Sequence, residues 1–209
     1  MSFAVGIPGT VGGALVSNAG AYRSSISDYL TEIEVVFEGS RQWVPPSFME
    51  FSYRDSILRR PEPPALALVR LRFKMGHGDP KTIYDDARDF QRQRISKQPP
   101  PASAGSFFKN VNDKALAATL EKLPAALKEA GVVPSGYLIE HSGLMGTRIG
   151  GAVLSGRHGN FILNVGGATA TDIRNLAEVA KIRVREKFGV QIEEEVLYLG
   201  DWSGFSPQS

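Results

Sequence analysis

The sequence has no cysteine and only three histidines among its 209 residues, at positions 77, 141 and 158. Without cysteine, the chain forms no disulfide, offers no thiolate to a metal ion and has no cysteine nucleophile. The histidines are too scattered to match the spacing of ligands in protein zinc sites. We therefore predict no metal site, and a cysteine-free chain fits the reducing environment of the cytoplasm.

Charge of one sign and long apolar runs are also lacking. The 24 basic and 22 acidic residues leave a net charge of +2, so the chain is not predicted to bind nucleic acid or an anionic membrane surface. No apolar run approaches the roughly 20 residues of a membrane-spanning helix. We also expect no secretory leader before the first motif. The sequence indicates no protein partner, and a small-molecule ligand is the simplest expectation.

What is present is the composition of a soluble globular protein, with 42% hydrophobic and 22% charged residues. A chain of this length can bury one large core or two smaller ones. Three consecutive prolines within residues 98–102 form the clearest interruption of the pattern. We predict an α+β fold with domains at residues 1–97 and 98–200, followed by a frayed tail at 201–209.

The hydrophobic pattern predicts strands where apolar and charged residues alternate and helices where apolar residues recur at helical spacing. The predicted strands are residues 32–38, 65–75, 149–155, 160–165 and 190–199, and residues 39–46 are predicted to turn. The predicted helices are 82–96, with Ile83, Ala87 and Phe90 on its apolar side, 113–130, and 134–139, with Pro134 in its first turn. A further helix is predicted over 171–188, capped by Thr171 and ended by Gly189.

Residues 6–22, GIPGTVGGALVSNAGAY, form a glycine-rich stretch with almost no charge. Glycine lets the main chain approach a flat or phosphorylated ligand closely, and successive amides can bind an anion. The stretch is neither the dinucleotide-binding G-x-G-x-x-G motif nor a P-loop. A simple turn is one interpretation, but the low polarity favours a buried, ligand-facing loop that leads into a short helix.

Residues 103–110, SAGSFFKN, place a serine hydroxyl on a tight glycine–serine step, followed by two aromatic residues and a polar pair. This order suits a reactive serine presented from a rigid support. The start of a strand with a capping serine is the competing interpretation.

Five stretches together resemble one family. They are residues 6–22, YRDS at 53–56, SAGSFFKN, GLMGTRIGGA at 143–152 and FGVQIEEEV at 188–196. Their order and spacing along nearly the whole chain resemble the flavoenzyme UDP-N-acetylenolpyruvoylglucosamine reductase, also called UDP-N-acetylmuramate dehydrogenase, in its shorter second type. The resemblance implies an oxidoreductase with FAD and NADPH that reduces UDP-N-acetylglucosamine enolpyruvate to UDP-N-acetylmuramate for peptidoglycan synthesis.

By the same resemblance, three residues carry the chemistry. Arg54 of YRDS matches the family's active-site arginine, Ser106 its proton-donating serine, and Glu195 its active-site glutamate. An ion pair of Arg54 with the adjacent Asp55, and a solvated carboxylate at Glu195, are the alternatives without a catalytic role.

The resemblance also implies binding residues. The positions that match the FAD-binding wall are Gly6, Ile7, Pro8, Gly9, Thr10, Val11, Gly12, Gly13, Ala14, Asn18, Ala19 and Gly20. The positions assigned to the UDP-sugar substrate are Tyr53, Lys109, Asn110, His158 and Asn160, and a structural role for His158 stays open.

The implied fold is the remainder of an FAD-binding domain of the FAD-linked oxidase type, followed by a mixed α/β substrate-binding domain. Members of the family carry a further N-terminal segment whose glycine-rich loop cradles the FAD pyrophosphate. We expect this segment to be missing here, so that the chain alone binds FAD weakly. The alternatives are a nucleotide-sugar binding module without a redox role, and an FAD-linked oxidoreductase with another substrate.

Overall fold

The computed structural model describes residues 1–207, which divide into two compact units, residues 1–96 and residues 97–207. The change from one unit to the other adjoins the proline-rich stretch at residues 98–102. Each unit has its own cluster of buried apolar side chains. Helices and antiparallel strands occur in both, which confirms the α+β fold. No helix in residues 1–207 is both long and apolar enough to cross a membrane.

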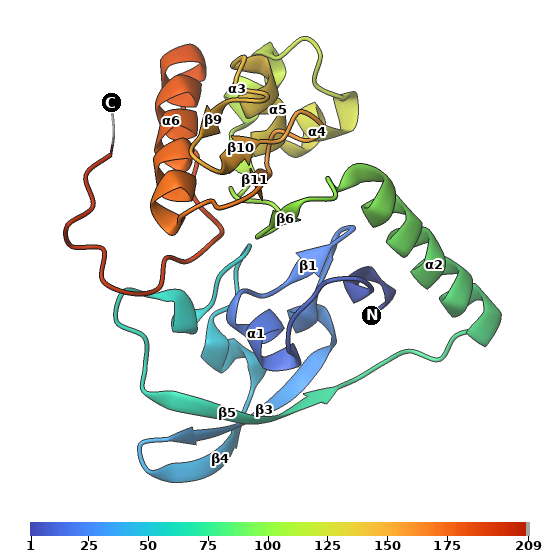
Figure 1. Cartoon of the computed structure of the whole chain (residues 1–209). Coiled ribbons are helices and arrows are strands. Elements are labelled where there is room, and N and C mark those ends of the chain that lie inside the picture. The colour runs from blue at the N-terminus through green and yellow to red at the C-terminus, as the bar shows by residue number, and fades with distance from the viewer. Residues whose placement is uncertain (208–209) are drawn as a thin grey trace. The chain divides into compact units, whose positions relative to one another are not determined.

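The first unit is built on a three-stranded antiparallel sheet in the order β4–β3–β5 (Figure 1). Its elements are η1 Ser2–Ala4, α1 Val11–Val16, β1 Gly20–Ala21, β2 Ser24–Ser25, η2 Ile26–Tyr29, β3 Leu30–Phe37, β4 Ser40–Val44, η3 Pro46–Met49, η4 Ile57–Arg59, β5 Leu66–Phe73 and α2 Pro80–Lys97, which ends the unit. Ile33 and Val35 of β3 are fully buried together with Leu15 of α1. Burial of these side chains holds the glycine-rich segment against the sheet.

The strand β4 lies where a turn was predicted for residues 39–46, and that prediction was wrong. The chain reverses at Glu38 and Gly39, where φ is 50° and 74°, and β4 then pairs with β3. Contacts with β3 explain why this largely polar segment is extended. Arg41 of β4 donates two hydrogen bonds, of 2.7 and 3.1 Å, to the buried carboxylate of Glu34 on β3. Arg70 of β5 lies 3.4 Å from the same carboxylate.

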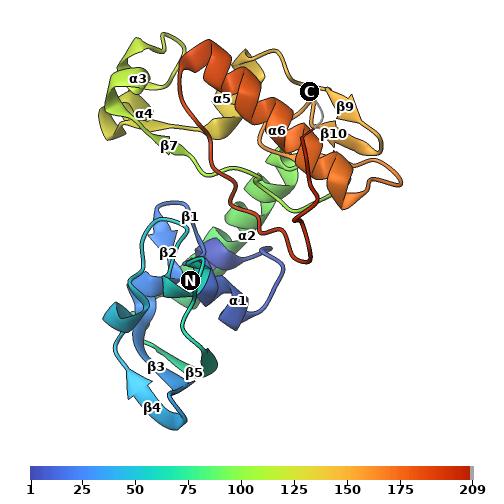
Figure 2. The ribbon, with the colours of Figure 1, turned by 90° about the vertical axis from the view of Figure 1, so that its left-hand side faces the viewer.

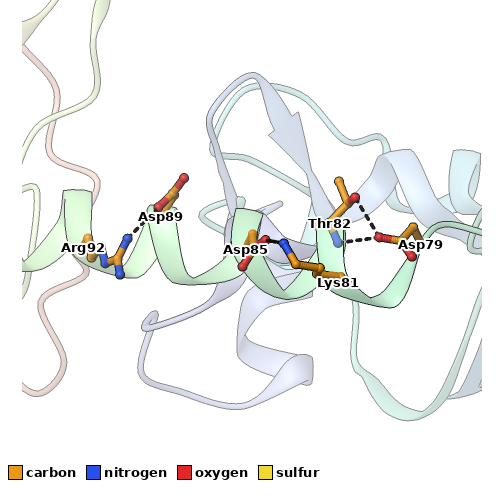
Figure 3. Close-up of polar contacts among 6 residues, drawn as sticks. All are labelled: Asp79, Lys81, Thr82, Asp85, Asp89 and Arg92. Carbon is orange, nitrogen blue, oxygen red and sulfur yellow. Dashed lines mark hydrogen bonds and ion pairs between the residues drawn. The ribbon is translucent and has the colours of Figure 1, made fainter.

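The helix α2 confirms the prediction for residues 82–96. The Asp79 carboxylate accepts hydrogen bonds of 2.9 Å from both the amide and the hydroxyl of Thr82, and ion pairs continue along the helix (Figure 3). Phe90 stacks on Tyr22 at 4.2 Å between ring centroids, which anchors the helix to the end of the glycine-rich segment. Ile83, in contrast, is 48% exposed, so its predicted inward position was wrong.

The second unit contains a four-stranded antiparallel sheet in the order β6–β11–β10–β9 and a separate pair, β7–β8. Its elements are β6 Ala102–Ser103, β7 Val111–Asn112, α3 Lys114–Thr119, α4 Ala125–Ala130, β8 Val132–Val133, α5 Ser135–His141, β9 Arg148–Ile149, β10 Ala152–Leu154, β11 Ile162–Asn164 and α6 Ala170–Phe188. The long helix α6 packs against β9, β10 and β11 (Figures 1 and 2). Leu176, Ala180 and Val184 of α6 are fully buried in this core, at the spacing predicted from the sequence.

Two elements predicted as continuous are each divided in two. The helix predicted for residues 113–130 is α3 followed by α4, because Pro124 has no amide hydrogen and disfavours helical conformation in Leu123. The strand predicted for 149–155 is the hairpin β9–β10, which reverses at Gly150 and Gly151. A Cβ atom at Gly151 would lie 2.3 Å from both the amide nitrogen of Ala168 and the carbonyl oxygen of Gly166. Only glycine fits at this close approach of backbones.

Helix boundaries in this unit differ slightly from the predictions. The cap of α6 is Thr169, not Thr171, and Thr169 forms a reciprocal capping box with Asp172. The predicted end at Gly189 is confirmed, since Gly189 adopts a left-handed conformation with φ of 70°. Pro134 is the cap of α5 and precedes its first turn.

The segment after α6 corrects two predictions. Residues 190–199 do not form a regular strand, and their pairing is limited to an isolated bridge between Phe108 and Glu194. Residues 201–207 were predicted as a frayed tail, but Trp202 and Phe205 pack around Arg174 of α6. Positions 208 and 209 lie outside the described residues.

Candidate active site

The serine segment, residues 106–109, lies in the second unit between two stretches that are distant in sequence. On one side, the amide of Phe107 donates a 2.8 Å hydrogen bond to the carbonyl of Asn160. On the other, the Lys109 amide donates to the Glu193 carbonyl and the Glu195 amide donates to the Phe107 carbonyl, both at 2.8 Å. Phe107 and Phe108 are buried, whereas Ser106 is exposed. The aromatic pair therefore fixes the backbone and leaves the hydroxyl accessible to a ligand.

Asn160 fixes the serine segment from within the core. Its side-chain oxygen accepts a hydrogen bond from the Phe108 amide, and its side-chain nitrogen donates to the Phe108 carbonyl, each at 2.8 Å and buried. The Asn160 carboxamide thus provides hydrogen-bond partners for both the buried N–H and the buried C=O of Phe108. Contact of Asn160 with substrate stays a prediction, and its visible role is to hold Phe108.

His158 supports the same turn. Its Nδ1 accepts a 3.2 Å hydrogen bond from the Asn160 amide, and its ring lies 4.9 Å from that of Phe161. Burial lowers the pKa of the His158 imidazole, which favours the neutral ring that this acceptor role requires. The geometry agrees with the structural role left open in the sequence analysis.

Lys109 and Asn110 follow the buried aromatic pair and are both half-buried. The carbonyl of Lys109 accepts a short hydrogen bond from the hydroxyl of Ser135, and Ser135 is fully buried at the start of α5. The ammonium of Lys109 lies 3.5 Å from the Glu193 carboxylate. Lys109 is thus paired with an acidic residue, and its contact with the substrate stays a prediction.

The segments that carry Ser106 and Glu195 are joined by the two backbone hydrogen bonds of Lys109 and Glu195, a short backbone ladder. Ser106 is one residue from the peptide whose carbonyl receives the Glu195 amide. Glu195 is half-buried on the neighbouring segment. Two of the three predicted catalytic residues, 89 positions apart in the printed sequence, therefore belong to one local structure. A joint role of their side chains in proton transfer stays a prediction.

Arg54 belongs to the first unit, in a tight turn closed by backbone hydrogen bonds between Ser52 and Asp55. Its φ is 56°, a left-handed conformation that a long side chain rarely adopts. Asn18 of the glycine-rich stretch donates a 3.0 Å hydrogen bond to the Ser52 carbonyl, and the Ser56 hydroxyl donates one of 2.7 Å to the carbonyl of Val16. These two hydrogen bonds attach the turn of Arg54 to the glycine-rich stretch.

The glycine-rich stretch borders an apolar pocket of about 350 Å³ within the first unit. The predicted cofactor-binding residues that line it are Ile7, Pro8, Gly9, Thr10, Val11, Gly13, Ala14 and Ala19. The other predicted ones, Gly6, Gly12, Asn18 and Gly20, are not among its lining residues. Residues 6–11 are exposed, so the prediction of a buried loop was wrong, although the turn does lead into the short helix α1.

Comparison with known proteins identifies the family that shares this region. A family model described as the C-terminal domain of UDP-N-acetylenolpyruvoylglucosamine reductase matches residues 95–199, which is half of the chain. The chain belongs to the UDP-N-acetylenolpyruvoylglucosamine reductase family. The matched region contains the serine segment, Asn160 and Glu195.

Similar proteins extend the likeness to the first unit. A UDP-N-acetylenolpyruvoylglucosamine reductase of Thermotoga maritima is 36% identical over 197 residues, which cover 94% of this chain and 62% of that protein. A protein of the same name from Acaryochloris marina is 39% identical over 203 residues, covering 96% and 59%. The crystal structure of the reductase from Thermus caldophilus has 32% sequence identity and a TM-score of 0.70, covering 93% of this chain and 62% of that one. The chain thus spans about three fifths of the length of these relatives.

The structure brings together some of the predicted residues of this reductase family and not others. Ser106, Lys109, Asn160 and Glu195 lie on adjoining segments of the second unit. Arg54 and Tyr53 lie in the first unit, and their approach to Ser106 stays a prediction. Ser135 was missed, because its only sequence signal is a small polar residue after a proline, which is typical of any helix start.

Proposed function

We propose that this chain is the larger part of an NADPH-dependent reductase that converts UDP-N-acetylglucosamine enolpyruvate to UDP-N-acetylmuramate in the cytoplasm, for peptidoglycan precursor synthesis. Membership of the reductase family supports the reaction class. The single observation that carries the assignment to residues is the backbone ladder that joins the segments of Ser106 and Glu195. The activity is proposed for the complete protein, because the chain spans about three fifths of its relatives.

The glycine-rich pocket fits part of the proposed cofactor, FAD. Its volume of about 350 Å³ is at the lower end of the range for small-molecule pockets, so it suits one flat ring system and not a whole dinucleotide. Its apolar lining matches a ring face, and Gly9 has φ of 134° with no atom near its Cβ position. When bound, FAD supplies the hydride that NADPH provides.

Arg54 is suited to hold the carboxylate of the enolpyruvyl group. Addition of hydride to the terminal carbon pushes negative charge toward that carboxylate, and a fixed guanidinium binds it more strongly as the charge develops. The turn between Ser52 and Asp55 fixes the backbone from which the arginine side chain extends. Tyr53, at the same turn, is exposed and available to the substrate.

Ser106 is suited to deliver the proton that the inner carbon needs. The hydroxyl proton passes to that carbon, and the serine oxygen recovers a proton from solvent or from a neighbouring group. Serine is a weak acid, so it serves only because the carbon it protonates is strongly basic. Glu195 is suited to orient the substrate or to share the proton. Lys109 and Asn110, next along the segment, are placed to meet the diphosphate of the UDP-sugar.

The test uses the complete protein, made by joining the N-terminal segment of a family member to this chain. In Ser106→Ala, flavin reduction by NADPH should keep its native rate, because Ser106 acts after that step. Reoxidation by the enolpyruvyl substrate should slow by about 10²- to 10⁴-fold, the usual contribution of a general acid. Ser47→Ala, at an exposed serine of the first unit, is the matched control. Native reoxidation in Ser106→Ala would show that the proton comes from elsewhere.

The same preparation separates the alternatives. Colourless protein that still binds the UDP-sugar would support a binding module without a redox role. Yellow protein that is reduced by NADPH but not reoxidised by the enolpyruvyl substrate would support an FAD-linked oxidoreductase with another substrate.

A further inference from the structure

Three aromatic rings from residues 198–205 surround one arginine. The guanidinium carbon of Arg174, in α6, lies 4.7 Å from the ring centroid of Tyr198, 4.7 Å from that of Trp202 and 4.0 Å from that of Phe205. The rings also pack edge to face, Tyr198 on Trp202 at 5.4 Å and Trp202 on Phe205 at 5.8 Å. Figure 2 shows the segment after α6 returning along that helix. We call this arrangement of Arg174, Tyr198, Trp202 and Phe205 the tail clamp.

In the tail clamp, aromatic ring faces surround the Arg174 guanidinium where carboxylate or carbonyl oxygens would usually accept its hydrogen bonds. The Nε and Nη1 atoms of Arg174 are buried and have no hydrogen-bond partner within residues 1–207. A guanidinium in this position is stabilised by the electron-rich faces of the rings around it. Lysine cannot reproduce the contact fully, because stacking depends on the planar guanidinium. The clamp is therefore specific to an arginine at position 174.

The clamp is connected to the candidate active site through Tyr198. The Tyr198 hydroxyl donates a 3.3 Å hydrogen bond to the Glu194 carboxylate. Glu194 also lies 2.5 Å from the ammonium of Lys181, which is 2.8 Å from Glu178 on the same helix. Burial alone would lower the pKa of Lys181, but its hydrogen bonds to Glu178 and Glu194 raise it, so it stays charged. Glu194 therefore forms an ion pair with Lys181 of α6 and accepts a hydrogen bond from Tyr198.

Glu194 is also the residue that faces Phe108 in the isolated bridge. Only two backbone hydrogen bonds, those of Lys109 and Glu195, join the segment 193–195 to the serine segment. So short a ladder has little cooperative stability of its own. The contacts of Glu194 and Tyr198 attach the segment at further points, beyond the two backbone bonds.

We propose that the tail clamp is a positioning device that holds Glu195 in register with Ser106, with Arg174 as its central positioning residue. The link to catalysis rests on the proposed function. The link to the register of residues 193–195 does not, because it follows from the contacts alone. Residues 198–205 then help to hold the candidate active site in place.

The test measures amide hydrogen exchange by NMR in the 209-residue chain. In Arg174→Gln and in Phe205→Ala, the amides of Lys109 and Glu195 should exchange roughly five- to thirtyfold faster, the range from the loss of an exposed to that of a desolvated cation–π contact. The amide of Ala180, in the core of α6, should change far less. Arg174→Lys should fall between Arg174→Gln and the native chain. Arg183→Gln, at an exposed arginine of the same helix, is the control and should match the native chain.

Trp202 fluorescence in a Trp43→Phe background reports independently whether the rings have moved. Native exchange at Lys109 and Glu195 despite displaced rings would overturn the proposal. Acceleration at Ala180 by the same factor would also overturn it, because the clamp would then stabilise the whole unit without positioning the site. In the complete protein, Arg174→Gln should lower kcat more than it raises KM. Absence of reductase activity in the complete protein would count against the proposed function alone. The exchange measurement needs no substrate, so it tests the positioning role of the tail clamp separately.

Discussion

Replacement of Asn160 by alanine tests whether this side chain mainly holds the serine segment. The change removes the hydrogen bonds of Asn160 to the Phe108 amide and to the Phe108 carbonyl. Phe108 is 1% exposed, so water does not readily replace either bond. Each buried polar group left unpaired costs about 1–3 kcal/mol. Two such groups, partly relieved by water entering the space, give an expected loss of about 3 kcal/mol in the free energy of unfolding of the second unit.

The assay is urea unfolding of the 209-residue chain in a Trp43→Phe background, so that Trp202 reports on the second unit alone. Asn112→Ala, at an exposed asparagine of the same unit, is the matched control and should lie within about 0.5 kcal/mol of the native chain. A loss below about 1 kcal/mol for Asn160→Ala would refute the reasoning from unpaired groups. If that variant also lost affinity for the UDP-sugar, Asn160 would be a substrate contact first.

Three further changes test other parts of the structure by equilibrium unfolding. Thr169→Ala should cost about 1 kcal/mol through loss of the α6 cap, whereas Thr171→Ala should be nearly neutral; the opposite order would restore the cap predicted from the sequence. Gly151→Ala should destabilise by about 1–3 kcal/mol because its Cβ meets backbone atoms, whereas Gly156→Ala, with open space around it, should not. A hydrogen bond from the adjacent arginine of β4 holds the pKa of Glu34 below its ordinary value of 4.5. The stability that Glu34 contributes is therefore present above that pH and lost as pH falls through the lowered pKa. Glu34→Gln should be less stable at neutral pH and should show a smaller loss on acidification; an unchanged acid dependence would contradict this.

Local sequence patterns determined those elements that bury one continuous face. The apolar spacing of α6 and its end at Gly189 follow from periodicity and capping chemistry. The presence of β3 and α2 was also predicted, although α2 has no buried residue and Glu34 of β3 is buried. Those patterns failed where a single residue decided the boundary. Pro124 divided a helix whose leucine spacing looked continuous, and Gly151 reversed a strand whose composition looked uniform.

Strand β4 and the tail show a different kind of failure. Three of the five residues of β4 are polar, and pairing with β3 and the ion pair of Arg41 with Glu34 make the segment extended. The tail has few apolar residues and no periodicity, yet its two aromatic rings pack around an arginine from a helix that ends earlier in the chain. Contacts between distant segments carry no local signal, because a propensity describes a residue only with its near neighbours.

By itself, the sequence determined the residue types of the site, since the motifs around Arg54, Ser106 and Glu195 and their resemblance to one reductase family are readable without coordinates. The tertiary structure decided how the site is held. It placed the segment of Glu195 against that of Ser106, assigned Asn160 to the buried Phe108 peptide and made the tail part of the second unit. The physical reason is that buried backbone groups must find hydrogen-bond partners wherever the fold brings them, and the partner that arrives is set by the packing of the whole unit.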